Sequence, residues 1–365
     1  MKILINASNL RQGGGLQVAD SICRLLNLYP QHNFIALLPN CLKNTGNEIS
    51  SYQNVDVVYY DIRNYIRSFF TLKIPFLDKL VKENNVNVVL TVFGPSRWRP
   101  RVKHLCGFAR AQVLPIETPY FKTISLKEKL HNAIIKHSFK FCSDCFWTEN
   151  PYITNLLQKE FPNKRIFTVS NSCNQVYNTP ENWVEHYLPP FNGTTILTVS
   201  NFYPHKNLTL AIPITEYLIK HYPSFNFRFV YTINQKDFPP LDENLLSHFL
   251  FIGDVSIAEC PSLYRQADIM FQPSLIECFT ATYPEAMKMK IPIVTSDLAF
   301  ARGLCGDAAL YYSALSAEEA GDLIYKLSVD SNLRQLLVKK GDNRLNSFMT
   351  AEQRIENLIK ILTSL

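Results

Sequence analysis

Short runs of β-branched and aromatic residues alternate with helix-length amphipathic segments, and this alternation occurs twice along the chain. The strand-like runs of the first half are residues 2–7, 33–38, 55–60, 87–92, 104–109, 145–148 and 165–170. Those of the second half are residues 195–200, 226–232, 249–253, 268–272, 292–295 and 309–311. Such alternation is typical of a mostly parallel sheet covered by helices on both faces. The sequence therefore predicts an α/β protein with two doubly wound, Rossmann-like domains facing a central cleft, where ligands of such sheets bind.

The length of the chain agrees with two domains, because 365 residues exceed what one ordinary core organises. We expect a first domain over residues 1–175 and a second over residues 194–348. Residues 176–193 are rich in Pro and Asn without periodicity, which predicts a linker. Residues 349–365 place apolar side chains at helical spacing and predict a final amphipathic helix.

Composition favours a globular enzyme of a reducing compartment. The chain is 47% hydrophobic and 19% charged, and it lacks a run of about 18 uncharged apolar residues that would span a membrane. Its first residues turn polar too early for a signal peptide. Nine cysteines without regular spacing argue against a disulfide framework and favour the cytoplasm. Cys142 and Cys145 have redox or zinc spacing but lack a second pair, so we interpret them as buried thiols.

Charge is distributed unevenly between the two halves. Residues 1–172 carry 22 Lys and Arg against 11 Asp and Glu, whereas residues 173–365 carry 15 against 20. Cations interleave with aromatic residues over residues 63–79 and again over residues 97–103. Such segments are solvated faces, or they bind an anionic membrane or nucleic acid. A functional role would favour the membrane, because no nucleic-acid module is recognisable.

Two carboxylates mark the candidate site. Glu277 and Glu285 lie eight residues apart, on a Thr-rich turn between a buried strand and the next helix. The start of a helix attracts anions through its free N–H groups and its dipole, and carboxylates beside it suit a ligand that carries hydroxyls as well as phosphates. A nucleotide sugar is such a ligand. The alternative is that Glu285 only complements the helix dipole and Glu277 is solvated.

Three further segments follow strands of the two predicted sheets. Gly13, Gly14 and Gly15 follow the first strand, where a backbone without side chains can approach a ligand closely. Lys206 opens a helix of the second half, an unfavourable place for a cation unless it meets an anion such as a diphosphate. Residues 251–255 end a strand in Gly-Asp, where backbone groups can meet a base.

The order of these motifs resembles the family-4 glycosyltransferases, the glycosyl transferases group 1, which have the two-domain GT-B fold and retain anomeric configuration. The resemblance covers nearly the whole chain, and its most specific part is the E-x7-E element, here with Glu277, Phe279 and Glu285. It implies that Glu277 and Lys206 are catalytic and that Glu285 binds ribose. It also implies that the C-terminal helix packs on the first domain. The further donor-binding residues that we expect are Phe279, Thr280, Ala281, His205, Gly14, Gly15, Asp254 and Val255.

Two departures from the family pattern concern charge near the donor. The family's arginine before the lysine is absent, and His205 takes part of its role. A first-domain histidine is also absent from residues 107–112, so either Arg110 or Gln112 positions the donor sugar, with His104 as a weaker candidate.

The resemblance implies transfer of a hexose-type sugar from a nucleotide diphosphate to a glycan or lipid-linked glycan. Surface polysaccharide synthesis, such as that of O-antigen (lipopolysaccharide) or capsule, at the inner face of the plasma membrane fits these substrates and the basic first half. We expect no metal and no cofactor, because a D-x-D motif is absent. Two alternatives stay open: a nucleotide-sugar epimerase of the same fold, and a non-catalytic membrane-docking protein with a degenerate donor site.

Overall fold

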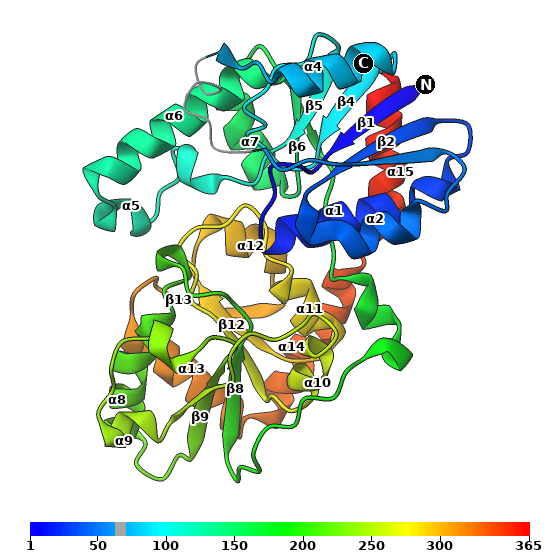
Figure 1. The fold of residues 1–365 in the computed structure, drawn as a ribbon. Coiled ribbons are helices and arrows are strands. Elements are labelled where there is room, and N and C mark those ends of the chain that lie inside the picture. Colours follow the sequence, from blue (N-terminus) through cyan, green and yellow to red (C-terminus); the bar gives the residue numbers. More distant parts are fainter. Residues whose placement is uncertain (63–70) are drawn as a thin grey trace. The chain divides into compact units, whose positions relative to one another are not determined.

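The computed structural model describes residues 1–62 and 71–365, which form two compact units. The first unit comprises residues 1–116, 124–171 and 349–365, and the second comprises residues 117–123 and 172–348. Each unit has one parallel sheet with helices on both faces (Figure 1). The α/β class and the two Rossmann-like sheets predicted from the sequence are therefore confirmed.

The first sheet has seven parallel strands in the order β3-β2-β1-β4-β5-β6-β7. The strands are β1 (Lys2–Asn6), β2 (Asn33–Leu38), β3 (Val55–Tyr59), β4 (Val88–Thr91), β5 (Lys103–Gly107), β6 (Cys145–Thr148) and β7 (Arg165–Thr168). The larger helices of this unit are α1 (Gly14–Arg24), α2 (Lys43–Ile49), α4 (Pro75–Glu83), α6 (Leu126–Cys142), α7 (Pro151–Glu160) and α15 (Ala351–Thr363). The five inner strands are almost wholly buried on both faces, as their nearly continuous apolar runs require, whereas the edge strands β3 and β7 are partly exposed.

The second sheet has six parallel strands in the order β10-β9-β8-β11-β12-β13. The strands are β8 (Thr194–Thr198), β9 (Phe227–Tyr231), β10 (Phe249–Phe251), β11 (Ile269–Gln272), β12 (Ile293–Ser296) and β13 (Ala309–Tyr312). Its helices are α5 (Tyr120–Thr123), α8 (Ala211–His221), α9 (Glu243–Leu246), α10 (Cys260–Arg265), α11 (Thr282–Lys288), α12 (Ala299–Cys305), α13 (Ala317–Val329) and α14 (Ser331–Leu345). Aromatic side chains of β9, β10 and β11 fill much of this core.

The C-terminal helix α15 belongs to the first unit although it follows the whole second unit in sequence. Ile355, Leu358, Ile359 and Leu362 join the core formed by β1, β4 and α1. The buried guanidinium of Arg354 donates to Ser21 Oγ at 2.7 Å and to Asn171 Oδ1. Burial lowers the pKa of Arg354 to about 10 and raises that of the nearby Glu149 to about 7. The helix is thus anchored by apolar packing and by buried hydrogen bonds.

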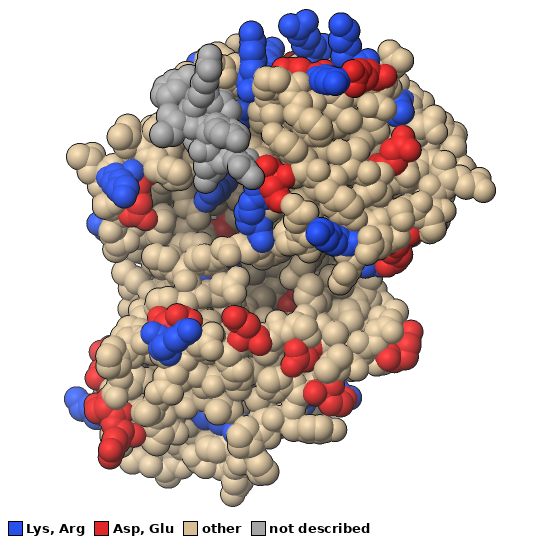
Figure 2. All heavy atoms as spheres, in the orientation of Figure 1, with Lys and Arg blue, Asp and Glu red and all other residues tan. Residues whose placement is uncertain are grey.

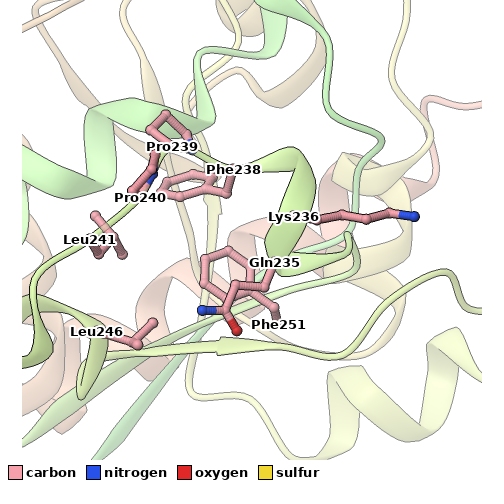
Figure 3. Close-up of a pocket in the computed structure, with 8 residues that line it drawn as sticks. All are labelled: Gln235, Lys236, Phe238, Pro239, Pro240, Leu241, Leu246 and Phe251. Carbon is pink, nitrogen blue, oxygen red and sulfur yellow. The ribbon is translucent and has the colours of Figure 1, made fainter.

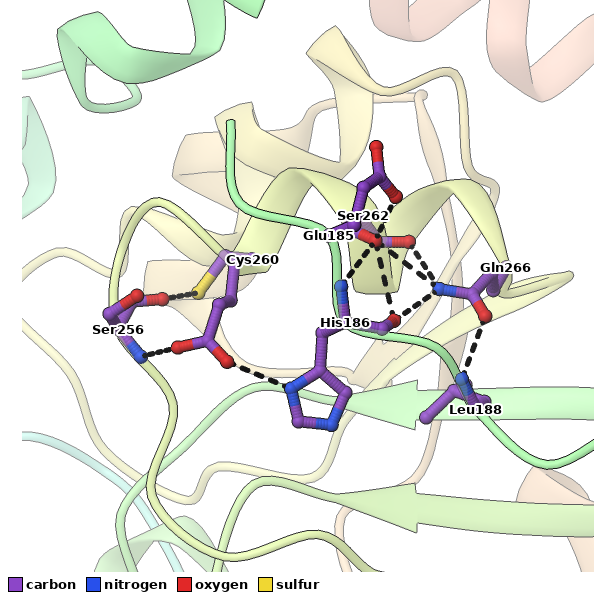
Figure 4. Close-up of polar contacts among 8 residues, drawn as sticks. Glu185, His186, Leu188, Ser256, Cys260, Ser262 and Gln266 are labelled. Carbon is purple, nitrogen blue, oxygen red and sulfur yellow. Dashed lines mark hydrogen bonds and ion pairs between the residues drawn. The ribbon is translucent and has the colours of Figure 1, made fainter. Parts of the chain in front are cut away.

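Residues 176–193, expected to be a linker, contact α10 of the second unit. His186 Nδ1 lies 2.9 Å from Glu259 Oε1, and this hydrogen bond lowers the pKa of Glu259 to about 2. Gln266 donates to the carbonyl of His186 and accepts from the N–H of Leu188 (Figure 4). The backbone polar groups of this segment need partners where it crosses the protein, and the side chains of α10 supply them.

Of the two cation–aromatic segments singled out in the sequence, the second has its aromatic residue in the core. Residues 63–70 lie outside the described part of the chain. In residues 97–103, Trp98 is fully buried and its indole N–H donates to Asp78 at 3.0 Å. Phe76 of α4 is 40% exposed and stacks on Tyr60. The aromatic member of the second segment therefore stabilises the core, and only its cations can face solvent.

The nine cysteines are free thiols, as predicted. Cys142 ends α6, Cys145 begins β6, and both are buried. Among the described residues, no helix is both long and apolar enough to cross a membrane. On the face shown in Figure 2, basic side chains lie over the first unit and acidic side chains are prominent over the second.

Candidate functional site

The candidate site lies where the strand order of the second sheet reverses. The order β9-β8-β11-β12 means that the connections after β8 and β11 leave toward opposite faces of the sheet. A crevice at the carboxyl ends of such neighbouring strands is where open α/β sheets bind ligands. The loop after β8 carries His205 and Lys206, and the loop after β11 carries Glu277. Topology alone therefore brings the two predicted catalytic residues together.

Lys206 and Glu277 form an ion pair at this position. Lys206 Nζ lies 2.6 Å from Glu277 Oε1, and the side chains are only 15% and 10% exposed. Lys206 ends a one-turn 3-10 helix (Pro204–Lys206), and the next residue, Asn207, has a left-handed backbone with φ 53°. This turn aims the lysine across the carboxyl edge of the sheet toward the β11 loop. The ammonium group has three donors, so it can keep Glu277 and still bind a phosphate oxygen.

Backbone contacts hold the two loops together. The N–H of Leu275 donates to the carbonyl of His205 at 2.8 Å, and Thr118 Oγ1 donates to the carbonyl of Leu275. The His205 ring stacks on Tyr203 with 7° between planes, and the Tyr120 ring meets it edge-on at 6.3 Å. The ion pair is consequently preorganised by its surroundings, which is what electrostatic catalysis requires.

Glu285 is the more deeply buried of the two carboxylates. It lies in α11 with 7% of its surface exposed, and the hydroxyl of Tyr264 donates to Glu285 Oε2 at 3.3 Å. Burial raises the pKa of Glu285 to about 7, although hydrogen bonds from Tyr177 and Tyr264 oppose the shift. A carboxyl with this pKa changes its charge easily when a ligand that donates hydrogen bonds arrives.

A ladder of polar side chains supports the loop between β11 and α11. Thr280 Oγ1 and Thr282 Oγ1 are 2.9 Å apart, and Gln272 Nε2 donates to Ser274 Oγ at 2.6 Å. Ser296 of β12 donates to the carbonyl of Ser274 at 2.6 Å. These side chains are all buried. The Thr-rich sequence thus serves to satisfy the loop's buried polar groups.

The other expected donor-binding residues of this unit lie on the same carboxyl edge. Phe279 is half-buried and its ring meets Phe348 edge-on, while Ala281 immediately precedes α11. Asp254 is exposed and Val255 half-buried, just after β10. Gly253 before them has φ 76°, a backbone conformation that favours glycine.

An open groove adjoins the end of β10 (Figure 3). Its lining residues are Gln235, Lys236, Phe238, Pro239, Pro240, Leu241, Leu246 and Phe251. The Lys236 side chain extends away from the other lining side chains, most of which are apolar (Figure 3). Its lining does not suit a diphosphate, whose charges require cations or N–H donors.

The remaining predicted residues belong to the first unit. Gly14 begins α1 and is exposed, and a Cβ at this position would meet no atom within 4 Å. Gly15 lies against Leu10 and Phe93. Arg110 is exposed and Gln112 half-buried, in the segment after β5. Their approach to the donor site stays a prediction.

His104, the weaker candidate, has a structural role. Its Nε2 lies 2.8 Å from Thr91 Oγ1, and its Nδ1 meets the carbonyl of Cys142 at 2.5 Å. Burial lowers the pKa of His104 to about 4. This neutral, fully bonded ring stabilises the first sheet, so its candidacy for the site is wrong.

The sequence interpretation missed Thr118 and Tyr120. Both lie in residues 117–123, which are flanked on both sides by the first unit yet pack into the second. No motif in the sequence indicates that residues 117–123 join the second unit, although Pro115 and Pro119 are typical of an irregular segment. Among the described residues, no group of three or more His, Cys, Asp or Glu could hold a metal ion.

Comparison with known proteins gives a family match for most of the second unit. Residues 181–344 match the family model "Glycosyl transferases group 1". No curated protein matches the chain.

Three solved structures show the same fold along essentially the whole chain. A glycosyltransferase from Rickettsia africae has a TM-score of 0.70 at 15% identity, covering 100% of this chain and 98% of that one. HepE of Anabaena, in complex with UDP and glucose, has a TM-score of 0.67 at 12% identity and 100% coverage of both chains. Sucrose-phosphate synthase from Thermosynechococcus elongatus has a TM-score of 0.68 at 13% identity, covering 100% and 98%.

The matched residues contain Lys206, Glu277 and Glu285 and make up most of the second unit. The resemblance to the glycosyl transferases group 1 that was read from the sequence is confirmed by the match of residues 181–344 to that family model, in a chain that has the GT-B fold.

Proposed function

We propose that this protein transfers a hexose-type sugar from a nucleotide-diphosphate donor to a glycan or lipid-linked glycan, with retention of configuration as in the family-4 enzymes. The observation that carries the proposal is the nearly buried Lys206–Glu277 pair at the switch point of a glycosyl transferases group 1 domain. A sheltered cation held by a carboxylate suits a diphosphate next to a sugar with hydroxyls. UDP is the first nucleotide to test, because the Anabaena protein was solved with UDP-glucose.

The proposed chemistry divides between the two residues. The bond between the sugar C1 and the diphosphate oxygen breaks, and its electron pair stays on the diphosphate, where Lys206 stabilises the developing charge. The acceptor hydroxyl forms the new bond to C1 on the same face and gives its proton to the departing phosphate. Glu277 orients Lys206 and accepts hydrogen bonds from the sugar. Glu285 binds the ribose hydroxyls.

The proposal is tested by separating binding from chemistry. Glu277→Gln keeps the shape and one hydrogen-bond acceptor but removes the charge, so we expect turnover to fall about 10²–10³-fold while UDP still stabilises the protein. Lys206→Ala should lower both turnover and the UDP-induced thermal shift, because the diphosphate loses its cation. Lys220→Ala, at an exposed lysine of α8, is the control and should leave both unchanged.

The assay uses a panel of nucleotide sugars with released nucleotide as the readout. Wild-type turnover is expected to persist in EDTA, since Lys206 takes the place of a metal. Near-normal turnover of Glu277→Gln would contradict the assignment. Conversion of the donor into another nucleotide sugar, without acceptor and without released nucleotide, would instead indicate an epimerase, and absence of both turnover and a nucleotide-induced shift would indicate a degenerate site.

Surface polysaccharide assembly at the cytoplasmic face of a membrane is the proposed setting. The excess of Lys and Arg in the first half supports this setting, because the cytoplasmic leaflet carries anionic lipids. Lipid-linked and free glycan acceptors, compared in the same assay, distinguish this setting from one without a membrane.

A further inference from the structure

Helix α6 of the first unit is buried along only part of its length. Its buried residues are Ile135, Ser138, Phe139 and Cys142, all in its second half. In residues 126–134 every side chain is exposed except the half-buried Asn132. The first turns of the helix extend away from the strands of the first unit (Figure 1). A second face of α6 is therefore open to solvent.

The open face carries an apolar stripe. Leu126, Leu130, Ile134 and Phe141 are 82%, 64%, 40% and 37% exposed. At about 100° per residue these four positions fall within a sector of about 80°, in which the exposed His137 also lies, against the Phe141 ring. The core-facing residues lie on another side of the helix, roughly 120° away. Single exposed apolar residues are ordinary, but an aligned set marks a binding surface.

Lysines border this stripe. On the same helical projection, Lys127 lies on one side, and Lys129 and Lys140 lie on the other. Lys140 Nζ is 5.5 Å from the centre of the Phe141 ring. A fourth lysine, Lys136, pairs with Glu160 at 2.7 Å. The stripe and these three bordering lysines are called the α6 face below.

The acidic residue of α6 is occupied by the capping of the helix. Glu128 Oε2 accepts from the N–H of Ser125 at 2.9 Å, while Ser125 Oγ accepts from the N–H of Glu128 at 3.2 Å. This capping box keeps the first turn helical without tertiary packing. It also places the carboxylate at the start of the helix, away from Lys140 near its end. The α6 face is therefore a preformed, basic, amphipathic surface.

We propose that the α6 face binds an anionic lipid bilayer, with the stripe dipping into the headgroup boundary and the lysines on lipid phosphates. Apolar stripes bordered by lysines bind membranes in this way, because long lysine stems let the ammonium groups reach the headgroups. A protein groove for the stripe would need acids on both sides. The proposal rests on the proposed function in one respect, because a lipid-linked acceptor would lie at a membrane. The α6 face is a different surface from the segment around the buried Trp98.

Vesicle binding tests the proposal on the full chain. Flotation with phosphatidylglycerol-containing vesicles is compared with pure phosphatidylcholine vesicles at low and high salt. Wild-type protein should bind the anionic vesicles and bind them less well in high salt. Leu130→Glu with Ile134→Glu, and separately Lys127→Glu with Lys129→Glu, should weaken binding at least about tenfold. All four side chains are exposed, so the fold should be unaffected.

Matched controls lie on α14 of the second unit, where Leu336 is 49% exposed and Lys339 is exposed. Leu336→Glu and Lys339→Glu should bind vesicles like the wild type. As a direct reporter, the fluorescence of Leu130→Trp should shift to the blue with anionic vesicles, and that of Leu336→Trp should not.

Two outcomes would overturn the proposal. If the α6 variants bind vesicles as well as the wild type, another surface holds the membrane. If no vesicle binds, and Leu130→Glu converts a larger assembly to monomer in light scattering, the α6 face is a protein interface. The UDP-induced thermal shift, measured on the same variants, reports the donor site separately, so failure of the proposed function is distinguished from failure of the lipid surface.

Discussion

Glu285 is a carboxyl group held in a largely apolar environment by α10 and α11. Burial raises its pKa to about 7, from an ordinary value of 4.5. The protonated form therefore favours folding, and this stabilisation is complete below about pH 4.5 and is lost as the pH rises through 7. A shift of this size corresponds to about 3 kcal/mol. A ribose that donates two hydroxyl hydrogen bonds favours the ionised form.

The consequence is a pH-dependent donor affinity. We expect the affinity for a UDP-sugar to fall as the pH drops below about 7, because a protonated carboxyl accepts fewer hydrogen bonds. In Glu285→Gln the affinity should be lower at every pH and nearly constant between pH 5.5 and 8. Calorimetry across this range is the measurement. Glu149→Gln is the control, because it removes a carboxyl with a similarly raised pKa from the first unit. If the donor affinities of wild type and Glu285→Gln changed with pH in parallel, the proposed role of Glu285 in binding ribose would be contradicted.

The positions of the candidate residues at the carboxyl edge of the second sheet were predictable where a local pattern indicated them, and their roles stay predictions. Glu277, Glu285 and Lys206 follow from spacing and from their place after strands. The direct pairing of Lys206 with Glu277 was not foreseen, because it depends on β8 and β11 being neighbours. His104 and Trp98 were misjudged for a related reason: a sequence does not show which way a side chain points. Both are buried and hydrogen-bonded within the first unit.

At the scale of elements, α15 is the clearest case of an expected helix whose partners lie far away in sequence. Leu358 is completely buried against the core of the first unit. We expect Leu358→Ala to lower the free energy of unfolding of this unit by about 2–5 kcal/mol, through lost transfer energy and the cavity left behind. Urea denaturation followed by circular dichroism is the measurement.

The control for this prediction is Lys360→Ala, which removes an exposed lysine of α15 paired with Glu356. Its effect should stay within about 0.5 kcal/mol, as for other surface pairs. Equal effects of the two substitutions would show that α15 contributes little to the first unit.

Strands were predicted best among the elements. Residues 33–38 and 145–148 have the same bounds in the structure, because runs of apolar residues ended by polar ones mark fully buried strands. Helices α2, α4 and α12 were missed. They have 7, 9 and 7 residues, too short for a clear period of 3.6. The open face of α6 was also missed, since an apolar stripe looks the same whether it is covered or not.

At the scale of the whole molecule, the two units differ in whether one continuous stretch of chain contains their whole core. Residues 172–348 contain a complete sheet and core. Residues 1–171 lack α15, so the apolar side chains that it covers on α1 and β4 would face water. We expect the fragment 172–348 to fold cooperatively, and the fragment 1–171 to bind a hydrophobic dye and unfold without a clear transition.

Addition of a peptide of residues 349–365 to the fragment 1–171 should restore cooperative unfolding, measured by near-ultraviolet circular dichroism. A peptide with Leu358→Ala and Leu362→Ala serves as the control, because it keeps the charges and removes buried contacts. Cooperative unfolding of 1–171 alone would contradict this expectation.

The course of α15 also sets an order of events during synthesis. The ribosome delivers the seven strands of the first sheet early, yet the helix that completes their core emerges only after all of residues 172–348. The nascent first unit must therefore keep an apolar surface open while the second unit is being made. That interval exposes the chain to chaperones or to aggregation, and the core of the first unit is completed only by a segment that is translated after the second unit.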